Sequence, residues 1–276
     1  MAGRDSIAPA TASTGVPLLD VRGVTMRYRT PEGALTALAD ISLTVARGEF
    51  VALVGPSGCG KSTLLAILAG LEQPSEGTVA LAGDPQARRL GRAGYMPQRD
   101  LLLPWRTALG NAIAGLEVKG VARGEAQQRA RALFADFGLA GFERSYPPLL
   151  SGGMRQRVAF ARTVLAGDDL LLLDEPFGAL DALTRASLQR WLLDIWGRLS
   201  KTCLLVTHDV DEALLLADRV YLLSARPGHV RLERRVPLER PRTREMLARA
   251  DLLALKAELL AALDEQQERS LAGGRI

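Results

Sequence analysis

The chain has 276 residues, of which 47% are hydrophobic and 24% charged, so it can bury the core of one large domain or of two lobes. The formal net charge is +4, yet arginines alternate with acidic residues at 231–235 and 239–245, so we expect solvated faces there and no nucleic-acid partner. Its two cysteines exclude a disulfide framework and favour a reducing compartment. The first residues lack the apolar stretch of a secretory signal, and no run of about eighteen apolar residues predicts a membrane span.

The N-terminal part predicts a tail followed by a hairpin. Residues 1–17 are rich in Ala, Ser, Thr, Gly and Pro, a composition typical of disorder. Apolar and β-branched residues alternate with polar ones at 18–27 and at 35–45, and a turn with Pro and Gly lies between them at 30–33. This pattern predicts two antiparallel strands.

A glycine-rich loop follows the apolar run 50–54. Its sequence, Gly55-Pro-Ser-Gly-Cys-Gly-Lys61-Ser62, leads into the helical run 63–69. Glycines let successive N–H groups point at phosphate oxygens, and a helix start adds its positive dipole end. Lys61 would reach the β and γ phosphates and the Ser62 hydroxyl would ligate Mg²⁺, so the loop predicts a site for a nucleoside triphosphate. Its Cys59 is either a thiol open to oxidants or simply a small residue that fits. The predicted nucleotide-binding residues in the loop are Gly55, Pro56, Ser57, Gly58, Cys59, Gly60, Lys61, Ser62 and Thr63.

The predicted secondary structure changes from strands to helices in the region after this loop. Residues 77–81 and 93–96 predict two more strands. From about residue 107 to residue 138 the chain has helical periodicity and many Ala, Arg and Gln residues. We therefore expect a separate helical lobe within about 99–165.

Short apolar runs return at 169–174, 203–206 and 219–223, each next to a helical segment. Wholly apolar strands that alternate with helices indicate a parallel sheet buried on both faces. The sequence therefore predicts an α/β fold of the P-loop NTPase class, with a parallel-sheet core, an antiparallel β subdomain and an inserted α-helical lobe. We place this domain at residues 18–240.

The remaining residues, 241–276, predict an amphipathic helix and a tail. Leucines recur at helical spacing from about Thr243 to Ser270. Such a helix would pack its apolar side against the body of the protein or against a partner.

An acidic pair, Asp174-Glu175, ends the apolar run that starts at Leu170. Ligands of open α/β sheets gather at the carboxyl ends of strands, so this pair should lie beside the phosphate-binding loop. Asp174 would hold Mg²⁺, and Glu175 would orient and deprotonate an attacking water. In isolation such a pair could equally be a cap.

A second segment, Leu150-Ser-Gly-Gly-Met154, also begins a helix. Ser151 is a good N-cap, and the two glycines after it expose backbone N–H groups. An ordinary helix start would account for these residues taken alone. In a chain that already has one phosphate loop, they instead predict an anion-binding helix start that acts on another copy.

With these motifs in place, residues from about 18 to 228 resemble the ATP-binding subunit of an ABC transporter. The resemblance implies a homodimer in the ATP-bound state, with each ATP between the phosphate loop of one copy and the signature loop of the other. We use "signature loop" for Ser151, Gly152, Gly153 and Met154. The implied cofactors are ATP and Mg²⁺.

The resemblance assigns four more residues. Tyr28 matches the aromatic residue that stacks on adenine, although core packing is an alternative. Gln98 matches the glutamine that senses Mg²⁺ and water, and Asp181 matches the aspartate of the loop that crosses the dimer. His208 matches the histidine that contacts the γ phosphate, where a structural histidine is the alternative. The implied catalytic residues are Lys61, Gln98, Glu175 and His208, and the implied metal ligands are Ser62, Gln98 and Asp174.

The segment 98–107 contains Leu-Leu-Pro-Trp and is similar to importer ATPases for nitrate, sulfonates, taurine and thiamine-precursor pyrimidines. The implied partners are membrane permease subunits and, indirectly, a solute-binding protein, at the cytoplasmic face of a bacterial inner membrane. One departure is Pro148-Leu149, where many such importers have His-Gln. An ABC exporter ATPase and a soluble ABC ATPase remain alternatives, whereas a P-loop kinase or GTPase has no need for residues 150–154.

Overall fold

The computed structural model describes residues 15–31, 33–199 and 201–273, so residues 1–14 of the predicted tail lie outside the described part. An antiparallel sheet with the order β2-β1-β4 begins the fold. The predicted hairpin is confirmed, although both strands extend to the turn because Thr30 still pairs with Gly33. The strands of this sheet are β1 (Leu19–Thr30), β2 (Gly33–Val45) and β4 (Glu76–Leu81).

The second sheet has the strand order β5-β6-β7-β3-β8-β9. Its first five strands are parallel, as predicted, and every residue of β3, β6 and β7 is buried. Apolar side chains on both faces explain why these runs do not alternate with polar residues. The strands are β3 (Phe50–Val54), β5 (Ala93–Met96), β6 (Leu170–Asp174), β7 (Thr202–Thr207), β8 (Arg219–Leu223) and β9 (Val230–Arg235).

The run 231–235 belongs to the antiparallel edge strand β9, where Arg231 and Arg235 are exposed, as predicted, and the residues between them are half-buried. Its charged residues find partners on neighbouring elements, since Arg219 pairs with Glu233 at 2.8 Å and Arg234 pairs with Glu258 at 2.5 Å. Charged side chains on an edge strand also discourage pairing with another chain. A charge-rich run can thus be a half-buried strand.

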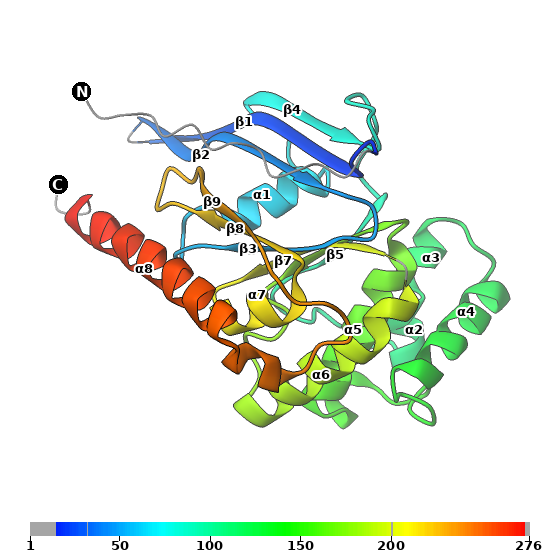
Figure 1. Ribbon diagram of the computed structural model, residues 1–276. Helices are drawn as coiled ribbons and strands as arrows, with labels where there is room; N and C mark the ends of the chain where they lie inside the picture. Colours follow the sequence, from blue (N-terminus) through cyan, green and yellow to red (C-terminus); the bar gives the residue numbers. More distant parts are fainter. Residues whose placement is uncertain (1–14, 32, 200, 274–276) are drawn as a thin grey trace, which may run out of the picture.

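Helices fill the spaces around the sheets (Figure 1). The helix α1 (Lys61–Leu68) lies between the two sheets and contributes Leu64, Leu65 and Ile67 to a core shared with both. The helices α5 (Gly152–Ala166), α6 (Ala182–Leu199) and α7 (Val210–Leu216) cover the other face of the six-stranded sheet.

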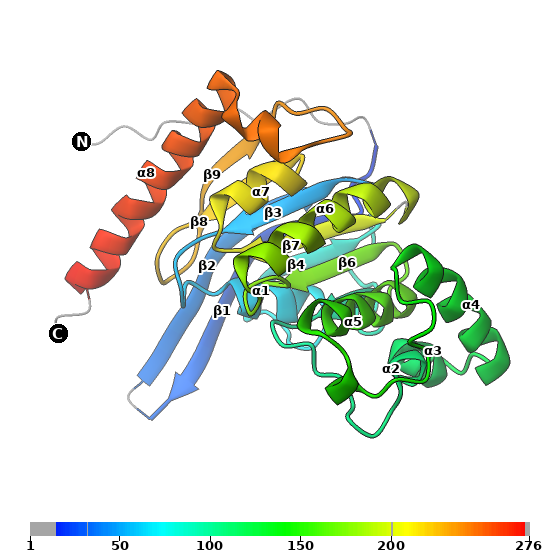
Figure 2. The same ribbon diagram turned by 90° about the horizontal axis from the view of Figure 1, so that it is seen from below.

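The region predicted to be a helical lobe is indeed helical. Figure 2 shows its helices gathered at one end of the molecule beside α5. The buried amide of Asn111 holds the segment before α2, because its Nδ2 donates to the carbonyls of Leu103, Arg106 and Thr107 and its Oδ1 accepts from the Leu103 N–H. The helices are α2 (Ala108–Ala112), α3 (Ala114–Val118), α4 (Arg123–Asp136) and a short 3₁₀ helix, η1 (Pro147–Leu149).

The predicted C-terminal helix begins later than expected. A 3₁₀ helix, η2 (Arg244–Ala248), comes first, and Arg249 is extended, with ψ 142°, before α8 (Ala250–Gly273) starts. Leu252 and Leu259 of α8 are buried against the body of the protein. Among the described residues, no helix is long and apolar enough to span a membrane.

The run 239–245 is exposed, as predicted, except at Arg242, which is 6% exposed. Its guanidinium donates to the carbonyls of Leu238 and Ala217 and to Asp218 Oδ1. Burial lowers the pKa of Arg242 to about 10. This arginine therefore ties the chain leading to α8 onto the end of α7.

Candidate active site

The carboxyl ends of β3, β6, β7 and β8 lie side by side, and the loops that leave them build the candidate site. The phosphate loop runs from Gly55 at the end of β3 to the start of α1. Gly60 has φ +104°, and a Cβ there would lie 2.6 Å from Leu38 Cδ2. Only glycine fits this turn, which explains its place in the motif.

Lys61 is 6% exposed, and its Nζ donates to the carbonyls of Gly55 at 2.7 Å and Pro56 at 2.8 Å. The ammonium is therefore held inside the loop whose N–H groups would face phosphate. Cys59 is 1% exposed, and burial raises the pKa of its thiol. A buried thiol that resists ionisation is a poor target for oxidants, so the geometry favours the interpretation of Cys59 as a small packing residue.

Asp174 ends β6 and is 5% exposed. Burial raises the pKa of its carboxyl, although the nearby hydroxyls of Ser62 and Tyr95 favour the ionised form. Ser62 and Asp174, both predicted metal ligands, are thus brought together. A hydroxyl and a carboxylate oxygen suit Mg²⁺, which takes few protein ligands and completes its shell with water and substrate phosphates.

Glu175 follows in a left-handed conformation, with φ +44°. Its Oε2 accepts a hydrogen bond from Gln98 Nε2 at 3.3 Å and lies 3.1 Å from His208 Nδ1. Three residues predicted to be catalytic therefore meet at one carboxylate oxygen. A non-glycine residue with positive φ is strained by about 1–3 kcal/mol and is often found at functional sites.

A single cavity of about 520 Å³ joins the phosphate loop to this carboxylate. Tyr28 lies at its wall, half-buried, and its hydroxyl donates to Glu72 Oε2 at 2.6 Å. Its ring also packs against the core, so its position fits both sequence interpretations. The cavity is lined by Tyr28, Leu35, Ala37, Ser57, Gly58, Gly60, Lys61, Ser62, Thr63, Gln98, Glu175, His208 and Arg226.

Arg226 is a lining residue that the sequence analysis missed. Its Nε and Nη2 both donate to the carbonyl of Gly58, at 3.1 and 2.9 Å. Gly228 lets this segment approach the phosphate loop, because a Cβ there would lie 2.2 Å from the carbonyl oxygen of Cys59. Arg226 comes three residues after the last residue of β8, so the rule that ligands gather at strand ends could have found it.

The signature loop does not line the cavity that contains the phosphate loop. Ser151 caps α5, with its Oγ accepting from the Met154 N–H at 3.2 Å. Asp181 caps α6 in the same way, since its Oδ1 accepts from the N–H groups of Leu183 and Thr184. Both loops line a second cavity of about 620 Å³ that shares no lining residue with the first. Within one chain, the structure does not bring the signature loop to the phosphate loop.

A phosphate loop that opens into a cavity with a strand-end carboxylate pair defines a P-loop nucleotide hydrolase. The signature loop distinguishes one family within this class. The sequence model described as "ABC transporter" matches residues 38–178. The aliphatic sulfonates import ATP-binding protein SsuB 1 of Rhodococcus jostii is 49% identical over 255 residues, which cover 92% of this chain and 96% of that protein. The formylaminopyrimidine import ATP-binding protein ThiZ of Halalkalibacterium halodurans is 44% identical over 231 residues, which cover 83% of this chain and 90% of that protein.

Solved structures agree with the sequence comparison. The dimeric structure of the bacterial ABC transporter cassette MJ0796 is similar with a TM-score of 0.69 and 31% identity, over 80% of this chain and 100% of that one. A post-hydrolysis state of that cassette, bound to ADP and Pi, matches equally well. The chain therefore belongs to the ABC transporter family as its ATP-binding, ATP-hydrolysing domain, and the predicted fold class is confirmed.

Proposed function

We propose that this chain is the ATP-hydrolysing subunit that energises a bacterial ABC importer for a small anion or small organic solute, such as a sulfonate or a thiamine-precursor pyrimidine. The assignment of ATP hydrolysis depends on one observation. Gln98 and His208 both contact Glu175 Oε2, on the wall of the cavity that contains the phosphate loop. The importer part is supported by relatives named for import of aliphatic sulfonates and of formylaminopyrimidine.

In the proposed mechanism, the N–H groups of the phosphate loop and Lys61 bind the β and γ phosphates. Mg²⁺, held by Ser62, Asp174 and Gln98, would supply charge neutralisation when bound with ATP. Glu175 orients the attacking water and accepts its proton. His208, hydrogen bonded to Glu175, contacts the γ phosphate.

The signature loop acts on the ATP of a second copy. Ser151 caps α5, a helix of 15 residues whose N-terminus favours anions. Because this loop and Asp181 share a cavity apart from the phosphate loop, one chain alone supplies half of each composite site. We therefore propose a head-to-tail homodimer in the ATP-bound state, and this agrees with the dimeric cassette described above.

A surface near Gln98 is proposed to receive the cytoplasmic helices of a permease. Leu101, Trp105 and Leu149 are 57%, 72% and 76% exposed, which is unusual for side chains of this size. The subunit would then lie on the cytoplasmic face of the inner membrane and act with a solute-binding protein only through the permease.

Two arginines of α5 link this surface to the signature loop. Arg155 Nε lies 3.3 Å from Asp100 Oδ2, and its Nη1 donates to the carbonyl of Leu150. Arg162 donates to the carbonyls of Asp100 and Leu101. These contacts provide a route for coupling even though Pro148-Leu149 replaces the His-Gln of many importers.

The proposal is tested by isolating the tagged protein from detergent-solubilised native membranes, identifying the copurifying chains by mass spectrometry and assaying ATP hydrolysis. We expect a permease with several membrane spans and an ATPase activity that requires Mg²⁺. A permease with its solute-binding protein would identify the solute. Copurification with a fused exporter or with soluble proteins alone would contradict the importer assignment, and absence of hydrolysis would contradict the assigned site.

A further inference from the structure

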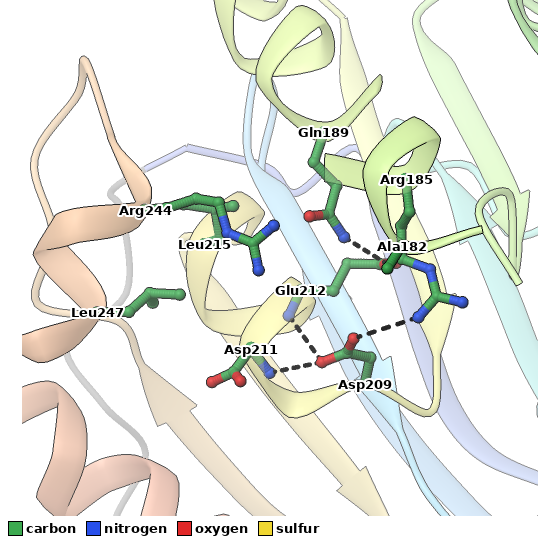
Figure 3. A pocket seen from close by; sticks show the side chains of 9 residues that line it. All are labelled: Ala182, Arg185, Gln189, Asp209, Asp211, Glu212, Leu215, Arg244 and Leu247. Atoms are coloured by element: carbon green, nitrogen blue, oxygen red, sulfur yellow. Dashed lines mark hydrogen bonds and ion pairs between the residues drawn. The ribbon is translucent and has the colours of Figure 1, made fainter. Parts of the chain in front are cut away.

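Behind the candidate active site, polar side chains of α6 face polar side chains at the start of α7 (Figure 3). They border a cavity of about 150 Å³. We call four of them the α6–α7 brace: Arg185, Gln189, Asp209 and Glu212. None of the four belongs to the predicted site, yet Asp209 follows His208 directly and Arg185 lies one helical turn after Asp181.

Arg185 joins the loop before α6 to the residue after His208. Its Nη2 donates to the carbonyl of Leu180 at 3.1 Å, within the dimer loop (residues 177–181). Its Nη1 lies 4.0 Å from Asp209 Oδ2. Asp209 is itself fixed, because its Oδ1 accepts from the N–H groups of Asp211 and Glu212 and caps α7.

Glu212 of α7 lies between Gln189 of α6 and Thr207, the residue before His208. It is 4% exposed, and its Oε2 accepts from Gln189 Nε2 at 3.1 Å. The hydroxyl of Thr207 lies beside this carboxyl and favours its ionised form. Among the described residues, Glu212 Oε1 has no hydrogen-bond partner, so the carboxyl is held from one side only.

Burial, followed by the charge of Asp209, raises the pKa of Glu212 to about 7. The charged groups around it are Arg185 on α6, Asp209 and Asp211 at the start of α7, and Arg244 of η2 across the cavity. Its ionised form would accept a stronger hydrogen bond from Gln189. The strength of this half of the brace therefore depends on pH near neutrality.

We propose that the α6–α7 brace positions His208 relative to the dimer loop. Docking of a second copy on Asp181 would then change the position of the histidine side chain. The residue after His208, Asp209, pairs with Arg185 of α6. The residue before it, Thr207, lies beside Glu212, which Gln189 of α6 holds. His208 is half-exposed and needs such anchors, because Glu175 is the one side chain among the described residues that holds its ring. The inference rests on the proposed function, and its residues are positioning residues that do not touch ATP.

The kinetic test uses Arg185→Ala, Arg185→Lys and Gln189→Leu, with Asp211→Asn as the matched control. Asp211 borders the same cavity but pairs with Lys256 of α8 at 2.7 Å, outside the brace. We expect Arg185→Ala and Gln189→Leu to lower kcat about tenfold with the KM for ATP within about twofold, because misplacing a catalytic group affects the transition state. Arg185→Lys should recover part of kcat, and Asp211→Asn should match the wild type. Equal kcat in all folded variants would overturn the proposal.

A second readout does not depend on turnover. The chain has two histidines, so the ring-proton resonances of His208 can be assigned by comparison with a His229→Gln variant. We expect those resonances to shift in Arg185→Ala and Glu212→Gln at a fixed pH, and to stay in place in Asp211→Asn. Unmoved resonances in folded protein, judged by thermal unfolding, would reject the brace even if Glu175→Gln abolishes hydrolysis. Loss of the proposed function alone would leave the resonance shifts intact.

Discussion

The phosphate loop and the signature loop are both glycine-containing starts of helices, but they lie in different surroundings. The phosphate loop opens into a cavity whose walls also include residues from β1 and β2 and from the loops after β5, β6, β7 and β8. Its lysine is 6% exposed and already held by loop carbonyls. The signature loop shares its cavity only with α5, the dimer loop and α6, and Leu183 at its rim is 85% exposed.

This difference shows which part of the catalytic machinery belongs to one chain. Both loops offer the partial positive charge of a helix start, and this charge alone attracts phosphate. Only the phosphate loop also has a carboxylate pair for a metal and a water, at Asp174 and Glu175. The signature loop has an exposed apolar rim instead, which is expected of a surface that another protein covers.

The largest expected effect tests the phosphate-loop region. In Glu175→Gln the amide keeps the shape of the side chain but cannot accept the proton of the attacking water. We expect turnover to fall about a thousandfold, within the range for loss of general-base catalysis, while ATP binding stays within about threefold. Single-turnover hydrolysis and binding of a fluorescent ATP analogue would measure the two quantities. Turnover near that of the wild type would remove Glu175 from its assigned role.

The next prediction concerns the α6–α7 brace that lies between the two regions. Since the pKa of Glu212 is raised from 4.5 to about 7, the folded chain binds more protons than the unfolded chain between these pH values. The free energy of unfolding should therefore fall as pH rises from about 4.5 through 7, by up to about 3 kcal/mol from this group. Glu212→Gln cannot titrate and should lack this fall.

Urea unfolding at pH 5 and pH 8 measures this difference for the wild type, Glu212→Gln and Asp211→Asn. The control keeps Glu212, so it should retain the fall of the wild type. If Glu212→Gln and the wild type lose the same stability between the two pH values, the carboxyl titrates in its ordinary range and the brace is not sensitive to pH near neutrality.

A smaller effect is expected at the signature loop. Ser151→Ala removes a hydroxyl that would face the ATP of the other copy, and we expect turnover to fall about thirtyfold, somewhat less than for the loss of a fixed donor in an anion site. The ATP affinity of the monomer should not change, because the residue lies outside the phosphate cavity. Ser187→Ala, in the same cavity but one turn into α6, should behave as the wild type.

The loss of an N-cap also destabilises the protein by about 1 kcal/mol, so thermal unfolding must accompany the assay. ATP-driven dimerisation, followed by size-exclusion chromatography in a Glu175→Gln background, separates the two effects. A Ser151→Ala chain that dimerises and turns over normally would mean that the signature loop does not act on a second copy.

Local patterns made the centre of this site predictable. The spacing from Gly55 to Ser62 requires no distant residue, and the apolar runs before Asp174 and His208 place both at the same sheet edge. The parallel sheet was also predictable, because its strands are short apolar runs that can be recognised without distant residues. Charged runs were harder to interpret, because partners far along the chain decide whether an arginine is solvated. Arg242 is buried by contacts with Ala217 and Asp218, which no periodicity reveals.

The brace is likewise a product of tertiary contacts, whereas the break at Arg249 is a change of backbone conformation at one residue. Gln189 and Glu212 are 23 residues apart and meet only because α6 and α7 pack on the same face of the sheet. The sequence predicted a single helix from Thr243 because leucines continue through the break. Backbone geometry at one residue leaves little trace in a pattern of apolar side chains.

The smallest predicted effect concerns Arg226, a residue outside the phosphate loop that contacts it. Its guanidinium donates twice to the Gly58 carbonyl, so it stiffens the loop and adds positive charge at the cavity wall. We expect Arg226→Ala to raise the KM for ATP about fivefold, which corresponds to about 1 kcal/mol, with kcat within about twofold. Arg226→Lys should restore the charge but not the paired hydrogen bonds, since an ammonium cannot reproduce the planar fork. A KM for Arg226→Lys equal to that of the wild type would assign the effect to charge alone, whereas one equal to that of Arg226→Ala would assign it to the bracing of Gly58. Unchanged KM in both variants would show that the phosphate loop keeps its shape without a contact from the end of β8.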